Sequence, residues 1–254
     1  METTQDGFLD NAFQVVQPAK GGHRAGLDAL LLAASVGPGA KGVLADFGSG
    51  AGVAGLAALH HASGLSAVLI ERDTDMAGLT KQSLGLNPSL QPRARVLNAD
   101  LTVRGSKRLA AGLSDNCFDW VIANPPFNGH QAHQPSPHAL KKSAHQMHEN
   151  LLSQWVETAR LTLRHKGELR FILRPQNLTA MLTALDGFGN CRILPIAPHA
   201  GKNAHRIIVA AKRGRSDPLQ ILPPLVLHKS TGGFTAEAET IMRGKNLASI
   251  MPPA

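Results

Sequence analysis

The sequence predicts an α/β fold around a largely parallel sheet, on two observations. From residue 43 onward, short runs of β-branched and aliphatic residues alternate with longer amphipathic stretches, as strands alternate with helices in such a fold. The chain also has 254 residues, of which 43% are hydrophobic and 17% charged, so it can bury a substantial core and does not resemble a disordered chain. We therefore expect one domain spanning residues 1–254.

Each expected element follows from its local pattern and its boundaries. The strands are short apolar runs bounded by Gly, Pro, Asn or Asp, at residues 43–47, 67–71, 94–97, 118–123, 169–173, 192–196 and 206–211. The helices are amphipathic stretches at residues 27–36, 53–61, 73–86, 151–163, 175–185 and 235–242. Asp28 favours the start of the first helix through the helix dipole, and Pro175 suits the first turn of another.

The net charge of +8 is unevenly distributed along the chain. Residues 1–127 carry 10 Lys and Arg against 11 Asp and Glu, whereas residues 128–254 carry 16 against 7, so the halves are −1 and +9. One strongly basic half predicts an anionic partner, of which nucleic acid is the commonest. The candidates to bind phosphate are Lys141, Lys142, Arg160, Arg164, Lys166, Arg174, Lys202, Arg206, Lys212, Arg213 and Arg215, and we expect only those near residue 124 to do so.

Other features argue against whole classes of protein. Cys117 and Cys191 are too few for a disulfide framework and form no CxxC pair. Five histidines between residues 130 and 148 have spacings that match no established metal site, so no metal is expected. No apolar run reaches the ~18 to 20 residues that cross a bilayer, and the first residues are acidic, which predicts a cytoplasmic protein.

A glycine-rich turn after the first core strand is a candidate binding element. Glycines permit positive φ and leave backbone amides open to a ligand. Gly50, Gly52 and Gly55 satisfy the GxGxxG pattern, and Glu71 follows Gly50 by 21 residues, so a dinucleotide site fits this segment. Glu71 would then accept hydrogen bonds from ribose hydroxyls. A glycine-rich turn that binds no nucleotide is the remaining interpretation.

Asp46 and Gly48 favour S-adenosylmethionine over a dinucleotide. They extend the turn to Asp-x-Gly-x-Gly-x-Gly, which resembles motif I of the class I methyltransferases. In that family the loop faces the methionine part of the cofactor and not a pyrophosphate. The resemblance therefore implies that Asp46, Gly48, Gly50 and Gly52 line a site for S-adenosylmethionine.

The strand at residues 118–123 ends abruptly in Asn124, Pro125, Pro126 and Phe127. Two prolines stop the sheet ladder at the edge where open α/β sheets bind ligands, so carbonyl oxygens there lose their regular partners. An amino group on a π-system is a poor nucleophile because its lone pair is delocalised. The Asn124 side-chain oxygen and the Pro125 carbonyl would hold both amino hydrogens and direct the lone pair at a methyl group. Phe127 would stack on a planar base.

In their order, the glycine turn, Glu71, Asp100 and the Asn-Pro-Pro-Phe motif resemble the class I S-adenosylmethionine-dependent amino-methyltransferases. Within them, the chain most resembles the small-domain branch that contains the bacterial tRNA1(Val) adenine-37 N6-methyltransferases. The resemblance implies a Rossmann-like fold with a mostly parallel seven-stranded sheet, helices on both faces and an antiparallel last strand. It also implies three segments: a lead-in over the cofactor at 1–40, the catalytic core at 41–215 and a C-terminal extension at 216–254.

The resemblance also implies the site residues. Glu71 matches the ribose ligand and Asp100 the ligand of the adenine amino group. The cofactor contacts that it implies are His23, Arg24, Asp46, Gly48, Gly50, Gly52, Glu71, Arg72, Asp100, Leu101 and Asn124. The catalytic residues that it implies are Asn124, Pro125, Pro126 and Phe127.

These observations favour an RNA amino-methyltransferase, with tRNA adenine N6 ahead of rRNA guanine N2. Several adenine-N6 members have Tyr where this chain has Phe127, so the motif indicates an amino nitrogen and not a particular base. Protein glutamine N5-methylation uses the same motif, although the basic charge argues against it. An NAD-binding protein and a catalytically silent RNA-binding module are the other hypotheses. We expect residues 128–145 to form a loop that acts as a lid or contacts RNA, and we expect a monomer.

Overall fold

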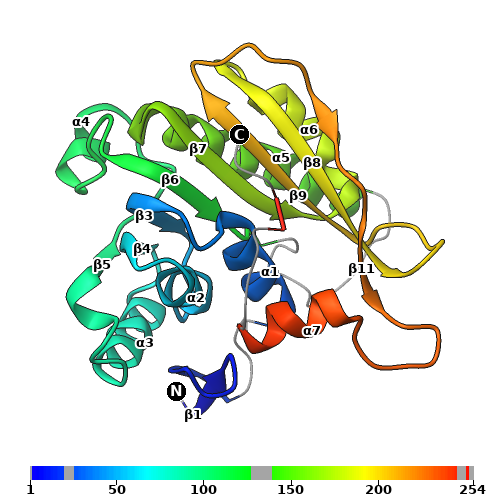
Figure 1. The fold of residues 1–254 in the computed structure, drawn as a ribbon. Coiled ribbons are helices and arrows are strands. Elements are labelled where there is room, and N and C mark those ends of the chain that lie inside the picture. Colours follow the sequence, from blue (N-terminus) through cyan, green and yellow to red (C-terminus); the bar gives the residue numbers. More distant parts are fainter. Residues whose placement is uncertain (1, 20–25, 127–138, 245–249, 252–254) are drawn as a thin grey trace.

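The computed structural model confirms the α/β class, with a central sheet and helices on both of its faces (Figure 1). It describes residues 2–19, 26–126, 139–244 and 250–251. The strands are β1 (Thr3–Phe8), β2 (Phe13–Pro18), β3 (Lys41–Phe47), β4 (Gly64–Glu71), β5 (Ala94–Asn98), β6 (Phe118–Ala123), β7 (Leu163–Leu173), β8 (Phe188–His199), β9 (Arg206–Arg213), β10 (Gln220–Ile221) and β11 (Leu225–His228). The helices are α1 (Leu27–Val36), α2 (Val53–His61), α3 (Thr74–Gly85), α4 (Gly105–Ala110), α5 (Ala139–Thr162), α6 (Leu178–Ala184) and α7 (Ala236–Arg243), with 3-10 turns at Gln91–Arg93 and Pro175–Asn177.

The seven predicted strands form one sheet in the order β8-β9-β7-β6-β3-β4-β5. All neighbouring pairs from β5 to β7 are parallel, and β9 is antiparallel to both β7 and β8. This is the topology that the resemblance implied. Two short strands of the C-terminal extension, β10 and β11, add to the outer side of β8, so the sheet has nine strands rather than seven.

The ends of the strands form two opposite sides of this sheet, which we call the carboxyl edge and the amino edge. The carboxyl edge is formed by the C-terminal ends of β3 to β8 and β11 together with the start of β9, because Leu173 at the end of β7 pairs with Ile207. The amino edge is formed by the opposite ends and includes the end of β9, since Glu168 pairs with Lys212. Ligands of open α/β sheets bind outside the carboxyl edge.

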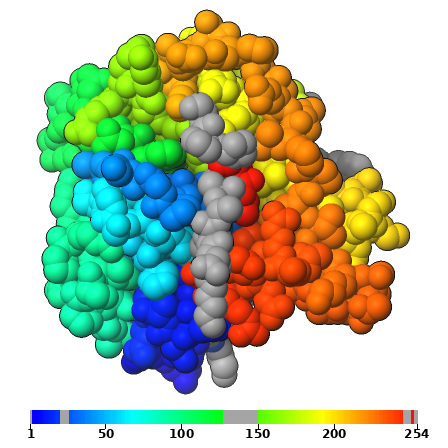
Figure 2. Space-filling model, viewed as in Figure 1, coloured from blue at the N-terminus to red at the C-terminus, as the bar shows by residue number. Residues whose placement is uncertain are grey.

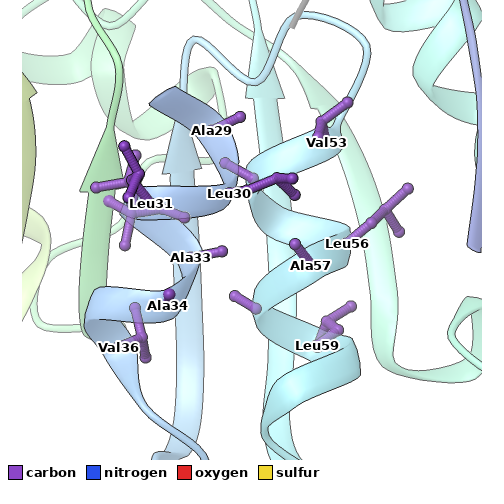
Figure 3. Close-up of a cluster of buried hydrophobic side chains, with 14 of the residues drawn as sticks. Ala29, Leu30, Leu31, Ala33, Ala34, Val36, Val53, Leu56, Ala57 and Leu59 are labelled. Carbon is purple, nitrogen blue, oxygen red and sulfur yellow. The ribbon is translucent and has the colours of Figure 1, made fainter. Parts of the chain in front are cut away.

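Two hydrophobic clusters sandwich the sheet. One lies under α1, α2 and α7, and the other lies under α5 and α6. Figure 3 shows α1 and α2 packed side by side, with Ala33 and Ala57 between them. These small side chains are buried, and they allow the two helix backbones to approach closely.

Two elements depart from expectation. Residues 3–18 form an antiparallel hairpin, which their many polar residues conceal in the sequence. It is fastened to α3, because the Val16 N–H donates to Ser83 Oγ (2.9 Å) and the Gln14 N–H donates to Asn87 Oδ1 (3.0 Å). The expected loop at 128–145 is wrong for its last part, since α5 begins at Ala139. Residues 127–138 lie outside the described part of the chain.

No helix within the described residues is both long enough and apolar enough to cross a membrane.

Candidate functional site

The glycine turn follows β3 at the carboxyl edge and has the backbone that its sequence requires. Gly48, Gly50 and Gly52 have φ of 67°, 55° and 91°, which other residues rarely adopt. A Cβ at Gly48 would lie 2.4 Å from the ring of Trp155, so this position must also be small. A Cβ at Gly50 would meet nothing closer than 3.9 Å, so the turn opens into space at Gly50.

Glu71, at the end of β4, holds the turn and its own following loop. Its Oε2 accepts the Gly50 N–H (3.0 Å) and its Oε1 accepts the Asp73 N–H (2.9 Å). Each carboxylate oxygen has two lone pairs, so each can accept a further bond from a ribose hydroxyl. The carboxylate is thus preorganised at the position that the sequence predicted for the ribose ligand.

Asn98 has a supporting role that sequence reasoning missed. It ends β5 beside Glu71, and its side-chain amide donates to the carbonyls of Glu71 (2.8 Å) and Arg72 (3.0 Å). Arg72 itself is exposed at the carboxyl edge. The signal was present in the sequence, since a polar Asn at a strand end is a common ligand of loop backbone.

Asp100 and Leu101 follow β5 on the same edge. Oδ1 of Asp100 accepts both the N–H (2.8 Å) and the hydroxyl (2.7 Å) of Thr102, which leaves Oδ2 without a bond to a described residue. Leu101 is buried, and its carbonyl accepts the Thr158 hydroxyl (2.7 Å). This bond ties the segment after β5 to α5.

Asp46 is buried beneath the glycine turn, where its Oδ2 accepts the Gly55 N–H in the first turn of α2 (2.9 Å). The pKa of Asp46 is raised to about 7. Burial is the largest cause and the charge of Glu71 adds to it, whereas the hydrogen bond from the Gly55 N–H acts in the opposite direction. The carboxyl group therefore supports the turn from below and titrates near neutrality. Direct contact with the cofactor stays a prediction for this residue.

Asn124 directly follows the last residue of β6, as the motif predicted. The ladder between β6 and β7 stops at Ala123, although β7 continues to Leu173. Pro125 is buried and Pro126 is exposed. Oδ1 of Asn124 is buried and makes no hydrogen bond to any described residue. Such an acceptor costs about 1–3 kcal/mol when it lacks a partner, so its presence at a binding edge indicates a ligand that donates to it.

The chemistry of this edge fits S-adenosylmethionine. The Ser49 hydroxyl in the glycine turn is a second buried polar atom without a partner among the described residues. The absence of a side chain at Gly50 leaves space for a ligand, Glu71 has free lone pairs for ribose hydroxyls, and Oδ2 of Asp100 is available for an amino group. Three neighbouring strands, β3, β4 and β5, therefore present complementary groups in a row.

Several predicted residues lie outside the described part of the chain. They are His23, Arg24 and Phe127, whose roles at the cofactor or at the substrate stay predictions. His130, His133 and His138, for which no metal role was expected, also lie outside it. Within the described residues, no group of three or more His, Cys, Asp or Glu could hold a metal ion.

One known family matches the part of the chain that contains most of these site residues. Residues 26–197 match the methyltransferase small domain, and this span includes the glycine turn, Glu71, Asp100 and Asn124. The chain belongs to the methyltransferase small-domain family. The prediction of a class I methyltransferase that uses S-adenosylmethionine is thereby confirmed, and the dinucleotide interpretation is set aside.

Several solved structures are similar to this fold. A protein from Agrobacterium tumefaciens, Atu636, described as a predicted O-methyltransferase, is 32% identical with a TM-score of 0.74, over 86% of this chain and 96% of that one. The T. thermophilus 16S rRNA N2 G1207 methyltransferase RsmC, solved with AdoMet and guanosine, is 18% identical with a TM-score of 0.55, over 84% of this chain and 50% of that one. P. horikoshii TYW2, solved with MeSAdo, is 12% identical with a TM-score of 0.55, over 84% and 72%. No curated protein matches the chain in sequence.

Proposed function

We propose that this methyltransferase acts on an exocyclic amino nitrogen of an RNA base, with adenine N6 in tRNA as the favoured target. The observation that carries the proposal is the buried Oδ1 of Asn124, which has no partner among the described residues and lies just after β6, the strand next to that of the glycine turn. A protein that only binds RNA has no use for such an acceptor at the cofactor edge.

The residues at the end of β6 suit an amino group better than a hydroxyl group. An amino group has two hydrogens, and the Asn124 side chain and the Pro125 carbonyl offer two acceptors on adjacent residues. A hydroxyl group has one hydrogen and needs a base to remove it before attack. The Agrobacterium protein is described as a predicted O-methyltransferase, but the Asn-Pro-Pro end of this chain favours transfer to nitrogen.

The chemistry then needs positioning rather than a strong base. Bound S-adenosylmethionine supplies a methyl group that is already activated on a sulfonium. Asn124 and Pro125 orient the amino nitrogen by accepting its hydrogens, so that its lone pair points along the transfer direction. The nitrogen becomes acidic as it takes up the methyl group, and its surplus proton leaves to solvent while these two acceptors keep the product oriented.

An RNA substrate is supported by charge at this edge. Arg72, Lys202 and Lys229 are exposed on it, and the chain carries a net charge of +8. Guanine N2 is the second candidate, because RsmC has the same fold and is described as acting on guanine of 16S rRNA. Protein glutamine N5 is the third candidate, and the basic charge disfavours it.

The test is incubation of the purified protein with unmodified cellular RNA and methyl-labelled S-adenosylmethionine, followed by mass spectrometry of the nucleosides. N6-methyladenosine is expected, and N2-methylguanosine would move the target to guanine. Asn124→Ala should lower the yield about 10²- to 10³-fold, as does the loss of one polar group that orients a transition state in other enzymes. Asn116→Gly is the matched control, because Asn116 is an exposed Asn at the amino edge with φ of 51°. Labelled ribose oxygens, or no labelled nucleoside, would contradict the proposal.

A further inference from the structure

A cluster of three rings lies at the carboxyl edge, beyond the cofactor site. His199 at the end of β8 and His228 at the end of β11 have ring centroids 5.5 Å apart and planes tilted by 42°. His228 in turn stacks on Phe234, with centroids 4.9 Å apart and planes 22° from parallel. His199 is exposed, whereas His228 and Phe234 are half-buried, so the cluster is open to solvent on the His199 side.

Two turns of the backbone hold these three rings in place. His228 pairs with His199 in the parallel register of β11 and β8, and with Phe234 in an isolated antiparallel bridge. The Lys202 N–H donates to the His199 carbonyl (3.1 Å), and the Lys229 N–H donates to the Gly233 carbonyl (3.1 Å). The rings are therefore carried by structured turns. Figure 2 shows both turns projecting from the same side of the molecule, in yellow and orange.

Two exposed lysines flank these rings. Lys202 and Lys229 lie on the two turns, are exposed, and form no ion pair with a described residue. We name the set His199, His228, Phe234, Lys202 and Lys229 the stacking patch.

We propose that the stacking patch binds single-stranded nucleotides of the RNA substrate at a distance from the methylated base. The inference rests on the proposed function and extends it to a second contact. Flat rings with one open side and neighbouring lysines are the combination that holds single-stranded nucleic acid, because bases stack on the rings and phosphates pair with the charges. The surface belongs to RNA rather than to an acidic protein because rings and charges alternate over two adjacent turns.

The position of the patch suits this role. It lies on the same edge of the sheet as Asn124, with β7 and β9 between β6 and β8. Strands are spaced by about 4.8 Å, so β8 is roughly 14 Å from β6 across the sheet, and His199 lies six residues further along β8 than Ile193, which is level with Ala123. A few nucleotides span that distance, so the patch would hold the strand next to a base that has left its stack to enter the site.

The charge test compares two double variants that remove the same charge. Lys202→Gln with Lys229→Gln changes the patch, whereas Lys41→Gln with Lys166→Gln changes two exposed lysines of the amino edge. Affinity for a tRNA transcript is measured by fluorescence anisotropy over a range of salt concentrations. The patch variant should lower the slope of log affinity against log salt by about 1.4, because two phosphate contacts to a single strand are lost. The control variant should keep the slope of the unaltered protein.

The stacking test uses Phe234→Leu, which keeps an apolar side chain but removes the ring. We expect the KM for RNA to rise about 5-fold or more, with kcat and the KM for S-adenosylmethionine unchanged. Thermal unfolding confirms that each variant is folded. An RNA affinity within twofold of that of the unaltered protein in both patch variants would overturn the inference, and so would equal slopes in the patch and control variants.

The two proposals fail differently. If the unaltered protein methylates no RNA nucleoside, the proposed function fails whatever the patch does. If it methylates RNA but the patch variants have an unaltered KM, only the stacking patch is refuted. If an acidic peptide competes with RNA at the patch while the salt slope stays unchanged in the patch variant, the surface belongs to a protein partner and the inference is overturned.

Discussion

Both edges of the sheet are basic, but their exposed positive charge has different surroundings. At the amino edge, arginines are paired within the protein: Arg164 with Asp119 (2.5 Å), Arg108 with Asp115 (2.5 Å) and Arg215 with Asp217 (2.7 Å). At the carboxyl edge, Arg206 pairs with Asp28. Exposed lysines occur at both edges, Lys41 and Lys166 at the amino edge and Lys202 and Lys229 at the carboxyl edge, but the latter two lie beside the rings of the stacking patch. Net charge therefore indicates an anionic partner without locating it, and the surroundings of each cation decide which are candidates to bind that partner.

The largest expected effect concerns a buried charge cluster in the amino half of the sheet. Oε1 of Glu168 accepts from Arg170 (2.6 Å) and from Arg192 (2.7 Å), all three are buried, and Arg170 lies over the ring of Trp120 (5.2 Å). Burial lowers the pKa of Arg170, and Glu168 opposes that shift. Glu168→Gln should lower the free energy of unfolding by about 3–5 kcal/mol, because it leaves two guanidinium groups buried without their counter-charge.

Urea denaturation measures this loss. Asp28→Asn is the matched control at the carboxyl edge, where the pair with Arg206 is 22% exposed on both sides. We expect it to cost about 0.2–1 kcal/mol. Equal losses in the two variants would show that the buried Glu168 cluster stabilises the fold no more than the partly exposed pair of Asp28 and Arg206.

The next effect separates two carboxylates that both hold a backbone N–H. Glu71 holds Gly50 at the carboxyl edge, and Asp119 holds Val43 (2.7 Å) at the amino edge. Glu71→Gln should weaken S-adenosylmethionine binding about 10- to 100-fold, because a hydrogen bond to a charged group is worth about 1.5–3 kcal/mol. Asp119→Asn should leave the affinity unchanged. Isothermal titration measures both, and similar losses in the two variants would contradict a cofactor site at Glu71.

Asp46 predicts a pH dependence of stability. Its pKa is raised by burial from 3.8 to about 7 in the folded protein, so the folded state binds more protons than the unfolded state between these values. Its contribution is thus fully present below pH 3.8 and is lost as pH rises towards about 7. The difference in unfolding free energy between the unaltered protein and Asp46→Asn should fall over this range and level off above it. Urea titrations at several pH values measure it, and a difference that rises with pH would contradict the burial of this carboxyl group.

The smallest effect is expected for Arg164→Gln. Arg164 is exposed and its pKa is raised by the hydrogen bond to Asp119, as in other surface ion pairs. The substitution should change the midpoint of thermal unfolding only slightly. It should leave the KM for RNA unaltered, because the proposed function puts the substrate at the carboxyl edge. A clear rise in KM would place RNA on this edge and break the comparison.

Local pattern predicted most of the framework. The bounds of α1, α2 and β6 agree with the predicted ranges, because each has a continuous apolar run and a glycine or proline at one end. The β1–β2 hairpin escaped prediction, since its contacts with α3 join segments that are distant in the chain. The first half of α5 escaped because its residues are mostly polar.

The placement of the candidate site residues was also predicted only in part. Gly50, Glu71 and Asn124 lie on one edge as expected, because parallel strands bring their C-terminal ends together. The sequence places a polar Asn98 at a strand end but does not show that it supports Glu71, and it gives no sign that Trp155 packs on Gly48. Both contacts join segments that are distant in the chain.

The sequence by itself determined the order of strands and helices, the glycine turn, the proline-terminated strand and the excess of positive charge, because each depends on neighbouring residues. Only the tertiary structure decided which cations are paired, which atoms are buried without partners, and which rings meet at the carboxyl edge. Those properties depend on the order and direction of strands in the sheet. Because β9 runs antiparallel to β7 and β8, its first residue Arg206 lies at the carboxyl edge and Lys212 lies at the amino edge, the reverse of what a parallel strand would give.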